Sequence, residues 1–362
     1  MKVKFPKYYS RFACIKGKCT DSCCVGWDIE IDEATRQKYE SLGGKLGERI
    51  RKEIYLSDED GCTYVKVKGD GKCPFLTEDG LCEIISRCGE KMISDICTRH
   101  PRYLARVDEF CEGGVGLCCL TAAEIILGAK ERDYTQNNYH LPYEISEEIG
   151  MLPLKLEKEL IKYRDEILKA VIKDNTSAAR SVSLVIENGN LLLRYIDLDA
   201  DPDMPCEDLP ELKESFGSGL GEVCRDLLEK LAECELLTED YGKELREAAE
   251  RAEKGGKALG EYLSGEFAPY LKRLLYYFIH RYYLAGLIDC SVGARMKLSA
   301  VYALAVGAIC FFKQASSLSE IAEAAKDFSK NIEYSEENTD KNIRDMYSYY
   351  LFTKESLNKI FS

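Results

Sequence analysis

Cysteine is the residue type whose number and spacing in this sequence suggest chemistry. The chain has 362 residues and 17 cysteines, and twelve of these cysteines lie within the first 120 residues. They occur as Cys14-x4-Cys19-x3-Cys23-Cys24, followed by Cys62, Cys73, Cys82, Cys88, Cys97, Cys111, Cys118 and Cys119. In a reducing compartment, clustered cysteines more often bind a metal or do redox chemistry than form disulfides. The N-terminal region is therefore predicted to hold a metal.

The spacing bears on which metal is bound. Thiolates select zinc or iron–sulfur clusters over hard cations, and structural zinc sites usually contain C-x2-C knuckles, of which this sequence has none. The opening run is similar to the C-x4-C-x2-C spacing of plant-type ferredoxins but is one residue longer. The C-x3-C-x2-C triplet of radical enzymes is incomplete, because Gly26 stands at its third position. The spacing therefore favours an iron–sulfur cluster that takes part in polar rather than radical chemistry. Zinc stays an alternative metal.

The remaining cysteines are expected to be small packing residues rather than ligands. They are Cys88, Cys111, Cys206, Cys224, Cys234, Cys290 and Cys310.

Short elements must position the cysteines of residues 1–130, which we expect to form a small α+β metal-binding domain. Helices are predicted over 32–43, with Asp32 as the N-cap, over 46–55, and over 89–100, where Pro101 ends the helix. Alternating residues between 63 and 84, with turns at 69–71 and 78–80, predict short strands. Thr121 and Glu124 have the spacing of a capping box at the start of a further helix.

Residues 140–362 are expected to form an α-helical domain, so the predicted fold class is mainly α. Apolar residues recur at helical spacing over 144–174, 221–252, 259–287 and 294–312. Residues 197–221 contain three prolines and an acidic run and predict a surface loop. The apolar stretch 298–312 is short for a bilayer span and predicts a buried helix.

Charge limits the possible partners. The net charge is −13, and residues 1–120 carry 20 basic and 20 acidic side chains, so residues 121–362, with 30 against 43, account for all of it. This balance argues against nucleic-acid binding, which needs a basic surface. The first ten residues lack the apolar core of a signal peptide. We expect a cytoplasmic protein with no membrane contact.

Four other features could carry chemistry, and each has a structural explanation. His280 lies in an apolar helix and is expected to be a core residue, whereas His100 lies close to Cys97. The glycine-rich segment 216–221 lacks a preceding strand and reads as a linker, not a Rossmann loop. Tyr276 and Tyr283 share one helix face and suit either packing or a cation–π contact to a sulfonium. Arg99, Arg102 and Arg106 could bind a carboxylate or pair with nearby acids.

Several motifs together resemble one known family. They are Pro6-Lys7-Tyr8-Tyr9, Cys14 to Cys19, Asp21-Ser22-Cys23-Cys24 with Gly26-Trp27, Cys73-Pro74-Phe75-Leu76, Gly80-Leu81-Cys82, Cys97 with Pro101-Arg102, Cys119 with Ala122-Ala123, and Ser335-Glu336-Glu337-Asn338. In this order they are similar to the flagellin lysine-N-methylase (FliB-like) family, which shares its cysteine pattern with a wider group of zinc- or iron-chelating proteins.

The resemblance implies an enzyme that uses S-adenosylmethionine and a [4Fe-4S] cluster to methylate lysines of flagellin. The family pattern matches eight cysteines, namely Cys14, Cys19, Cys23, Cys24, Cys73, Cys82, Cys97 and Cys119. A cubane takes at most four of them, and Cys19, Cys23, Cys82 and Cys97 rank highest. Cys118 leaves the assignment of Cys119 open. Arg99 and Arg102 are the candidates for binding the carboxylate of the cofactor.

Two other functions stay open at this point. One is an iron–sulfur electron carrier, which the long helical region disfavours, because a carrier needs little more than its cluster-binding fold. The other is a zinc-stapled interaction protein without methyltransferase activity.

Overall fold

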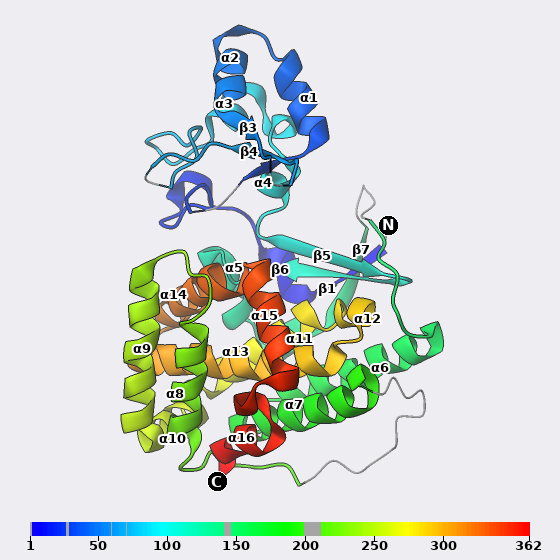
Figure 1. The fold of residues 1–362 in the computed structure, drawn as a ribbon, viewed down its shortest axis with the longest axis vertical. Helices are drawn as coiled ribbons and strands as arrows, with labels where there is room; N and C mark the ends of the chain where they lie inside the picture. The colour runs from blue at the N-terminus through cyan, green and yellow to red at the C-terminus, as the bar shows by residue number, and fades with distance from the viewer. Residues whose placement is uncertain (1, 27–28, 59, 70, 141–145, 199–210) are drawn as a thin grey trace. The chain divides into compact units, whose positions relative to one another are not determined.

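The chain divides into two compact units in the computed structural model, which describes residues 2–26, 29–58, 60–69, 71–140, 146–198 and 211–362 (Figure 1). The smaller unit is Ala13–Tyr103, and the larger unit combines Met1–Phe12 with Leu104–Ser362. The expected ranges 1–130 and 140–362 divide the chain elsewhere, because the N-terminal strand and residues 104–130 fold with the helices. Sixteen α-helices fall within the described residues, so the mainly α class is confirmed.

The smaller unit is an α+β structure built from short elements. Its sheet has the order β2-β4-β3, with both strand pairs antiparallel. The elements are β2 (Glu30–Ile31), α1 (Glu33–Ser41), α2 (Gly44–Lys52), β3 (Ile54–Leu56), β4 (Thr63–Val65), α3 (Glu83–Cys88) and α4 (Asp95–Arg99), with 3-10 turns at Lys16–Lys18 and Glu90–Met92. As predicted, Asp32 caps α1 by accepting the Thr35 N–H at 2.9 Å. The Asp32 carboxylate therefore satisfies a donor that the helix start would otherwise leave unpaired.

Two predictions in this unit are wrong in detail. Among the described residues of 63–84, β4 is the one expected strand that forms, and it pairs with the upstream strands β2 and β3. The later described residues make the isolated bridges Val25–Lys72 and Leu76–Cys82. Loops that bend every few residues leave no length for a ladder. The helix expected over 89–100 is broken into a 3-10 turn and α4, because the backbone of Ile93 and Ser94 between them is extended.

A four-stranded sheet in the larger unit was not predicted from the sequence. Its order is β5-β6-β1-β7, with β1 parallel to β6 and antiparallel to β7. The strands are β1 (Lys2–Pro6), β5 (Arg102–Val107), β6 (Phe110–Val115) and β7 (Gln136–His140). Strands this short and this distant in sequence give little periodic signal, and only the fold brings them together.

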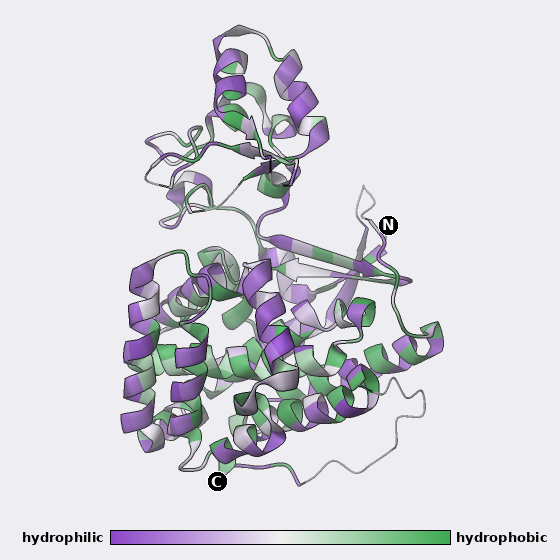
Figure 2. Ribbon diagram, in the orientation of Figure 1, coloured by the Kyte–Doolittle hydropathy of each residue, from purple (hydrophilic) through white to green (hydrophobic). Residues whose placement is uncertain are grey.

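Helices make up the rest of the larger unit. They are α5 (Leu120–Leu127), α6 (Leu154–Ile172), α7 (Ala178–Leu192), α8 (Leu220–Leu231), α9 (Glu239–Lys254), α10 (Gly256–Ser264), α11 (Ala268–Tyr282), α12 (Gly286–Asp289), α13 (Val292–Phe312), α14 (Leu318–Phe328), α15 (Glu336–Ser348) and α16 (Lys354–Asn358). Short 3-10 turns lie at Lys7–Arg11, Glu131–Tyr134, Tyr350–Phe352 and Lys359–Phe361, and π-turns at Leu193–Leu198 and Ser329–Glu333. The outer helices α8 and α9 alternate between hydrophilic and hydrophobic residues, as amphipathic surface helices do (Figure 2).

Helix α13 forms the core of this unit. It is the one helix of the described residues that is long and apolar enough to cross a membrane, but 83% of its apolar window is buried inside the protein. It packs against α7 and α11. The buried helix predicted at 298–312 is therefore confirmed.

Several predicted helix boundaries need correction. The helix expected over 144–174 begins only at Leu154, because Pro153 stands at its N-cap; residues 144 and 145 lie outside the described part. The ranges 221–252 and 259–287 each hold more than one helix. The capping box at Thr121 is wrong, because α5 begins at Leu120 with Cys119 as its N-cap. In the predicted loop 197–221, residues 199–210 are not described, and α8 takes the last two positions.

Candidate functional site

The thiols of the smaller unit gather beside its hydrophobic core. That core consists of Ile29, Ile31, Tyr39, Ile50, Val65, Cys73, Phe75 and Ile84. Cys73 is buried within it, and Cys24 and Cys82 pack against it. Cys97, on α4, is exposed. The thiols therefore extend from the core of the unit to its surface.

Backbone hydrogen bonds hold three of these cysteines in register. The N–H of Cys73 donates to the carbonyl of Cys24 at 2.8 Å, and the N–H of Glu83 donates to the carbonyl of Phe75 at 2.8 Å. Leu76 and Cys82 form an isolated β-bridge. Cys24, Cys73 and Cys82 are thus fixed by the main chain, although the sequence places them up to 58 residues apart.

The electrostatics identify which thiols are neighbours. Burial, with a smaller contribution from the charges of Cys24, Cys82 and Cys97, raises the pKa of Cys73 to about 12. Desolvation raises the pKa values of Cys82 and Cys97 as well; Cys24 adds to both shifts, and Cys82 adds to that of Cys97. In every pair among Cys24, Cys73, Cys82 and Cys97, the charge of one thiol therefore raises the pKa of the other. We call these four residues the thiol quartet.

Further residues report on the same group. The pKa of the buried Tyr39 is raised by desolvation and by the charges of Cys97, Cys82 and Cys73, so its ring lies beside the quartet. Cys23 and Cys24 share a hydrogen bond that raises the pKa of Cys23 and lowers that of Cys24. One thiol of this pair therefore ionises more readily than an ordinary thiol.

The thiols are not gathered as metal ligands are. Among the residues that the structure describes, no three Cys, His, Asp or Glu side chains lie close enough together to hold a metal ion. The metal-binding character expected for the N-terminal region is therefore not shown. The chemistry of the donors still suits a soft metal, because the four thiols of the quartet occupy one small unit.

The other predicted ligands lie at different places. Cys14 and Cys23 are exposed, and the hydrogen bond with Cys24 and the charges of Cys24, Cys14 and Cys97 raise the pKa of Cys23. Cys19 instead donates its S–H to the carbonyl of Asp21 at 3.1 Å. Cys119 belongs to the larger unit, where it precedes α5, beside the buried Cys118. Within its motif, Trp27 lies outside the described residues.

The three predicted arginines differ in their surroundings. Arg99 pairs with Asp95 on its own helix, with Nη2 at 2.7 Å from the carboxylate. Arg102 is half-buried at the start of β5. Arg106 belongs to the larger unit and pairs with Glu147 at 2.7 Å. The alternative of pairing with nearby acids thus holds for Arg99 and Arg106.

Three of the seven cysteines expected to be packing residues lie in the core. Cys224, Cys234 and Cys310 are buried, whereas Cys88, Cys111 and Cys290 are half-buried, and Cys206 lies outside the described residues. His280 is also buried, and burial lowers its pKa to about 4, so its imidazole is neutral. The core assignment of His280 is confirmed.

Tyr276 and Tyr283 have different surroundings. Tyr283 is buried, with its ring 5.7 Å from the guanidinium carbon of Arg164. Tyr276 lines a cavity of the larger unit, together with residues such as Asp165 and Gln136 that the sequence did not single out. No motif marks these two, since they lie on a helix and a strand that only the fold brings together.

Comparison with known proteins gives three similar sequences. The chain is 30% identical over 129 residues to the Lysine-N-methylase of Salmonella typhimurium (strain LT2), which is 34% of this chain and 32% of that protein. It is 29% identical over 129 residues to the Flagellar biosynthetic protein FliU of Salmonella muenchen, covering 76% of that protein, and to the Lysine-N-methylase of Salmonella choleraesuis (strain SC-B67), covering 32%.

The match thus spans about a third of the length of these lysine-N-methylases. No family model matches the chain, and no solved structure matches it. The similarities confirm the resemblance to the FliB-like lysine-N-methylases that the motifs indicated.

Proposed function

We propose that this relative of the FliB-like lysine-N-methylases is itself a protein-lysine N-methyltransferase, that it uses S-adenosylmethionine, and that its substrate is flagellin. The observation that carries the proposal is the similarity to two proteins named Lysine-N-methylase. The name of the third relative, a flagellar biosynthetic protein, supports a flagellar substrate. A flagellin subunit is made in the cytoplasm, so we propose that the enzyme acts there.

We further propose that the smaller unit binds a [4Fe-4S] cluster through the thiol quartet. The effects of the charges of Cys24, Cys73, Cys82 and Cys97 on one another and the backbone hydrogen bond from Cys73 to Cys24 support this choice. Four thiolates are the usual ligand set of a cubane. Cys14 and Cys23 are exposed, and Cys19 and Cys119 are the weaker candidates of the eight.

When bound, the cluster would supply redox chemistry or, with one ligand position open, a Lewis-acid iron that positions or activates the cofactor. If the four thiols of the quartet occupy all four ligand positions of the cluster, no iron is open to the cofactor. This ligand set favours polar methyl transfer without contact between iron and cofactor. A cofactor bound in the smaller unit would have Arg99 and Arg102 as the candidate cations for its carboxylate. A cluster open to the cofactor would change its EPR spectrum when S-adenosylmethionine is added.

Transfer of a methyl group to lysine requires a neutral amine, because the protonated amine has no lone pair. The ordinary lysine pKa of about 10.4 must therefore fall on binding, or a base must take the proton. A carboxylate beside the amine would raise its pKa, so acidic residues that attract the substrate cannot also activate it. We therefore propose that the residues that attract the substrate and the residues that deprotonate its lysine amine are different ones.

The test combines metal analysis with a methylation assay. Protein purified without oxygen should contain iron and acid-labile sulfide at cubane stoichiometry. With S-adenosylmethionine it should add mass in methyl increments to lysines of flagellin from its own organism. Stoichiometric zinc without sulfide would favour the zinc-stapled interaction protein. An intact cluster with neither methylation nor cofactor binding would favour the electron carrier.

A further inference from the structure

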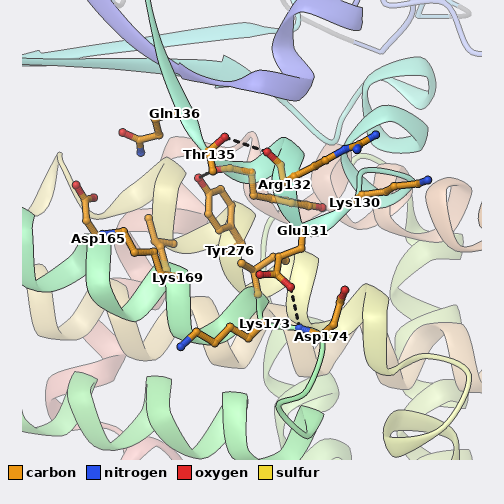
Figure 3. Close-up of a pocket in the computed structure, with 13 residues that line it drawn as sticks. Lys130, Glu131, Arg132, Thr135, Gln136, Asp165, Lys169, Lys173, Asp174 and Tyr276 are labelled. Atoms are coloured by element: carbon orange, nitrogen blue, oxygen red, sulfur yellow. Dashed lines mark hydrogen bonds between the residues drawn. The ribbon is translucent and has the colours of Figure 1, made fainter.

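The larger unit contains a cavity of about 690 Å³ between α6, β7 and the turn Glu131–Tyr134 (Figure 3). Small-molecule sites in proteins usually have volumes of about 300–1,000 Å³. Four residues with buried side chains supply its apolar surface, namely Tyr134, Leu168, Ile172 and Tyr276. The cavity can therefore take a ligand of cofactor size with an apolar or aromatic part.

Its aromatic surface is fixed in place. The hydroxyl of Tyr276 donates to the carbonyl of Tyr134 at 2.6 Å, and the two rings meet edge to face with their centroids 4.7 Å apart. Figure 3 shows Tyr276 in the middle of the lining residues. The Tyr276 ring is almost fully buried and stacks on His280 with the ring centroids 6.0 Å apart, so it forms part of a rigid apolar floor of the cavity.

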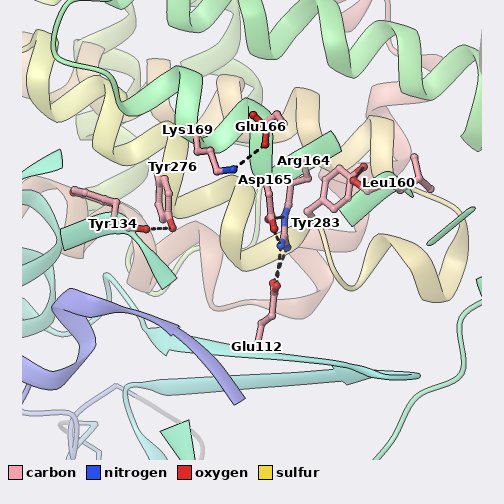
Figure 4. A network of polar contacts seen from close by, with 9 residues as sticks. All are labelled: Glu112, Tyr134, Leu160, Arg164, Asp165, Glu166, Lys169, Tyr276 and Tyr283. Atoms are coloured by element: carbon pink, nitrogen blue, oxygen red, sulfur yellow. Dashed lines mark hydrogen bonds and ion pairs between the residues drawn. The ribbon is translucent and has the colours of Figure 1, made fainter. Parts of the chain in front are cut away.

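One carboxylate of the cavity is oriented by a buried ion pair (Figure 4). Arg164 is fully buried and binds Glu112 through two hydrogen bonds of 2.6 and 2.7 Å. The same guanidinium donates to Oδ1 of Asp165 at 2.7 and 3.1 Å. Within the described residues no hydrogen bond reaches Oδ2 of Asp165, whose side chain is 30% exposed. This oxygen is positioned to accept a hydrogen bond from a ligand.

The charges around the cavity are mixed. It is lined by the cations Lys130, Arg132, Lys169 and Lys173 and by the carboxylates Glu131, Asp165 and Asp174. Carboxylates disfavour a polyphosphate, and four cations disfavour a simple amine, since like charges repel at short range. A ligand that carries both signs satisfies both sets. Figure 3 shows Asp165 and Gln136 on one side of Tyr276, and Arg132 and Lys130 on the other.

We propose that this cavity binds S-adenosylmethionine. The ribose hydroxyls or the adenine amine would face Asp165 and Gln136, as an acidic residue binds ribose in dinucleotide sites. The sulfonium and its methyl group would lie against the apolar floor beside Tyr276, and the methionine carboxylate would bind near Lys130 and Arg132. The proposal rests on the proposed function and places the cofactor in the larger unit rather than at Arg99 and Arg102.

The test measures binding of S-adenosylhomocysteine, the demethylated product, to the full anaerobically purified chain by calorimetry. Asp165→Asn should weaken binding about tenfold or more, because a hydrogen bond to a charged group contributes about 1.5–3 kcal/mol. Gln136→Trp fills the cavity without touching the Arg164 ion pairs and should abolish binding. Glu166→Gln, one residue from Asp165 and outside the cavity lining, serves as the control. Glu166 forms an exposed ion pair with Lys169, and such pairs contribute little, so this variant should bind within about twofold of wild type.

Melting curves of each variant separate lost binding from lost folding. If Asp165→Asn melts early, Gln136→Trp decides the question. Wild-type affinity in both cavity variants, or loss of binding in Arg102→Gln instead, would overturn the cavity assignment while the methyltransferase proposal stands. A wild-type protein with a full cluster that neither binds the ligand nor methylates flagellin would overturn the proposed function itself.

Discussion

At the scale of single residues, the question is which of the eight cysteines of the family pattern would bind the cluster. We propose the four members of the thiol quartet. Among the eight cysteines of the family pattern, Cys19, Cys23, Cys82 and Cys97 ranked highest. The fold instead turns the side chain of Cys19 to the carbonyl of Asp21 and places Cys24 and Cys73 in direct backbone contact. Adjacent cysteines look equivalent in a sequence. Their hydrogen bonds and neighbours distinguish them.

Serine variants test this assignment. We expect Cys24→Ser, Cys73→Ser, Cys82→Ser and Cys97→Ser each to lower iron content and stability, because metal-binding free energy contributes to the stability of a small metal site. Iron per chain and the melting temperature are the readouts. Cys19→Ser and the control Cys88→Ser, at the end of α3, should keep full iron. Iron loss in Cys19→Ser but not in Cys73→Ser would contradict the quartet.

At the scale of elements, a buried ion pair links the sheet of the larger unit to a helix, and a glycine allows two of its helical segments to cross closely. The Glu112–Arg164 pair links β6 to α6, and it also orients Asp165 in the cavity. Burial alone would raise the pKa of Glu112, but the charge of Arg164 outweighs it and lowers the pKa to about 2. Packing of sheet on helix thus depends on an ion pair with no contact to water.

Glu112→Gln should destabilise the protein by about 3–5 kcal/mol, because it leaves Arg164 buried without its full partner. Chemical denaturation at pH 7 measures this loss. The folded pKa lies below the ordinary value of 4.5, so the pair stabilises wild type above pH 4.5 and loses this contribution as the pH falls towards 2. The variant should lack that part of the acid dependence.

Glu109→Gln is the matched control on the same hairpin. Glu109 forms a half-exposed pair with Lys158 at 3.1 Å, which should contribute less than about 1 kcal/mol. Equal losses in the two variants would show that burial of Glu112 is not what matters.

The close crossing of α13 with the segment after α7 depends on Gly293. A Cβ atom at this position would lie 2.0 Å from the backbone nitrogen of Leu193. We therefore expect Gly293→Ala to cost about 3 kcal/mol or more, since backbone must move to relieve the overlap. Gly260→Ala in α10 meets its neighbours at 3.6 Å and should instead stabilise by about 0.5–1 kcal/mol. Thermal melts compare the two, and the same sign for both would refute the argument.

At the scale of the whole molecule, the uneven charge matters for encounter with a protein substrate. All of the net −13 falls within residues 121–362. A negative field attracts a lysine-rich surface at low ionic strength and is screened over about 8–10 Å at physiological salt. The field would raise the association rate, and it does not activate the amine.

The rate of flagellin methylation should accordingly fall by roughly several-fold between low and physiological salt. Initial rates at limiting flagellin measure this effect. Neutralising the exposed Glu239 and Glu247 of α9 should weaken the salt dependence and leave iron content unchanged. Neutralising the exposed Lys243 and Lys257 should strengthen it. A rate independent of salt in all forms would exclude steering.

The sequence by itself determined the local and compositional features. It predicted the mainly α class, the Asp32 cap, the buried helix within α13, the core position of His280 and the resemblance to the lysine-N-methylases. These depend on periodicity, on residues a few positions apart or on motif order, all of which a linear sequence contains.

Only the tertiary structure decided what depends on distant contacts. The β5-β6-β1-β7 sheet joins residues near both ends of the first 140, and the cavity joins β7, α6 and α11. Cys24 and Cys73 are neighbours through one backbone hydrogen bond across 49 positions. Such contacts form because burying apolar surface and pairing backbone groups brings remote segments together, and no local pattern encodes which segments meet.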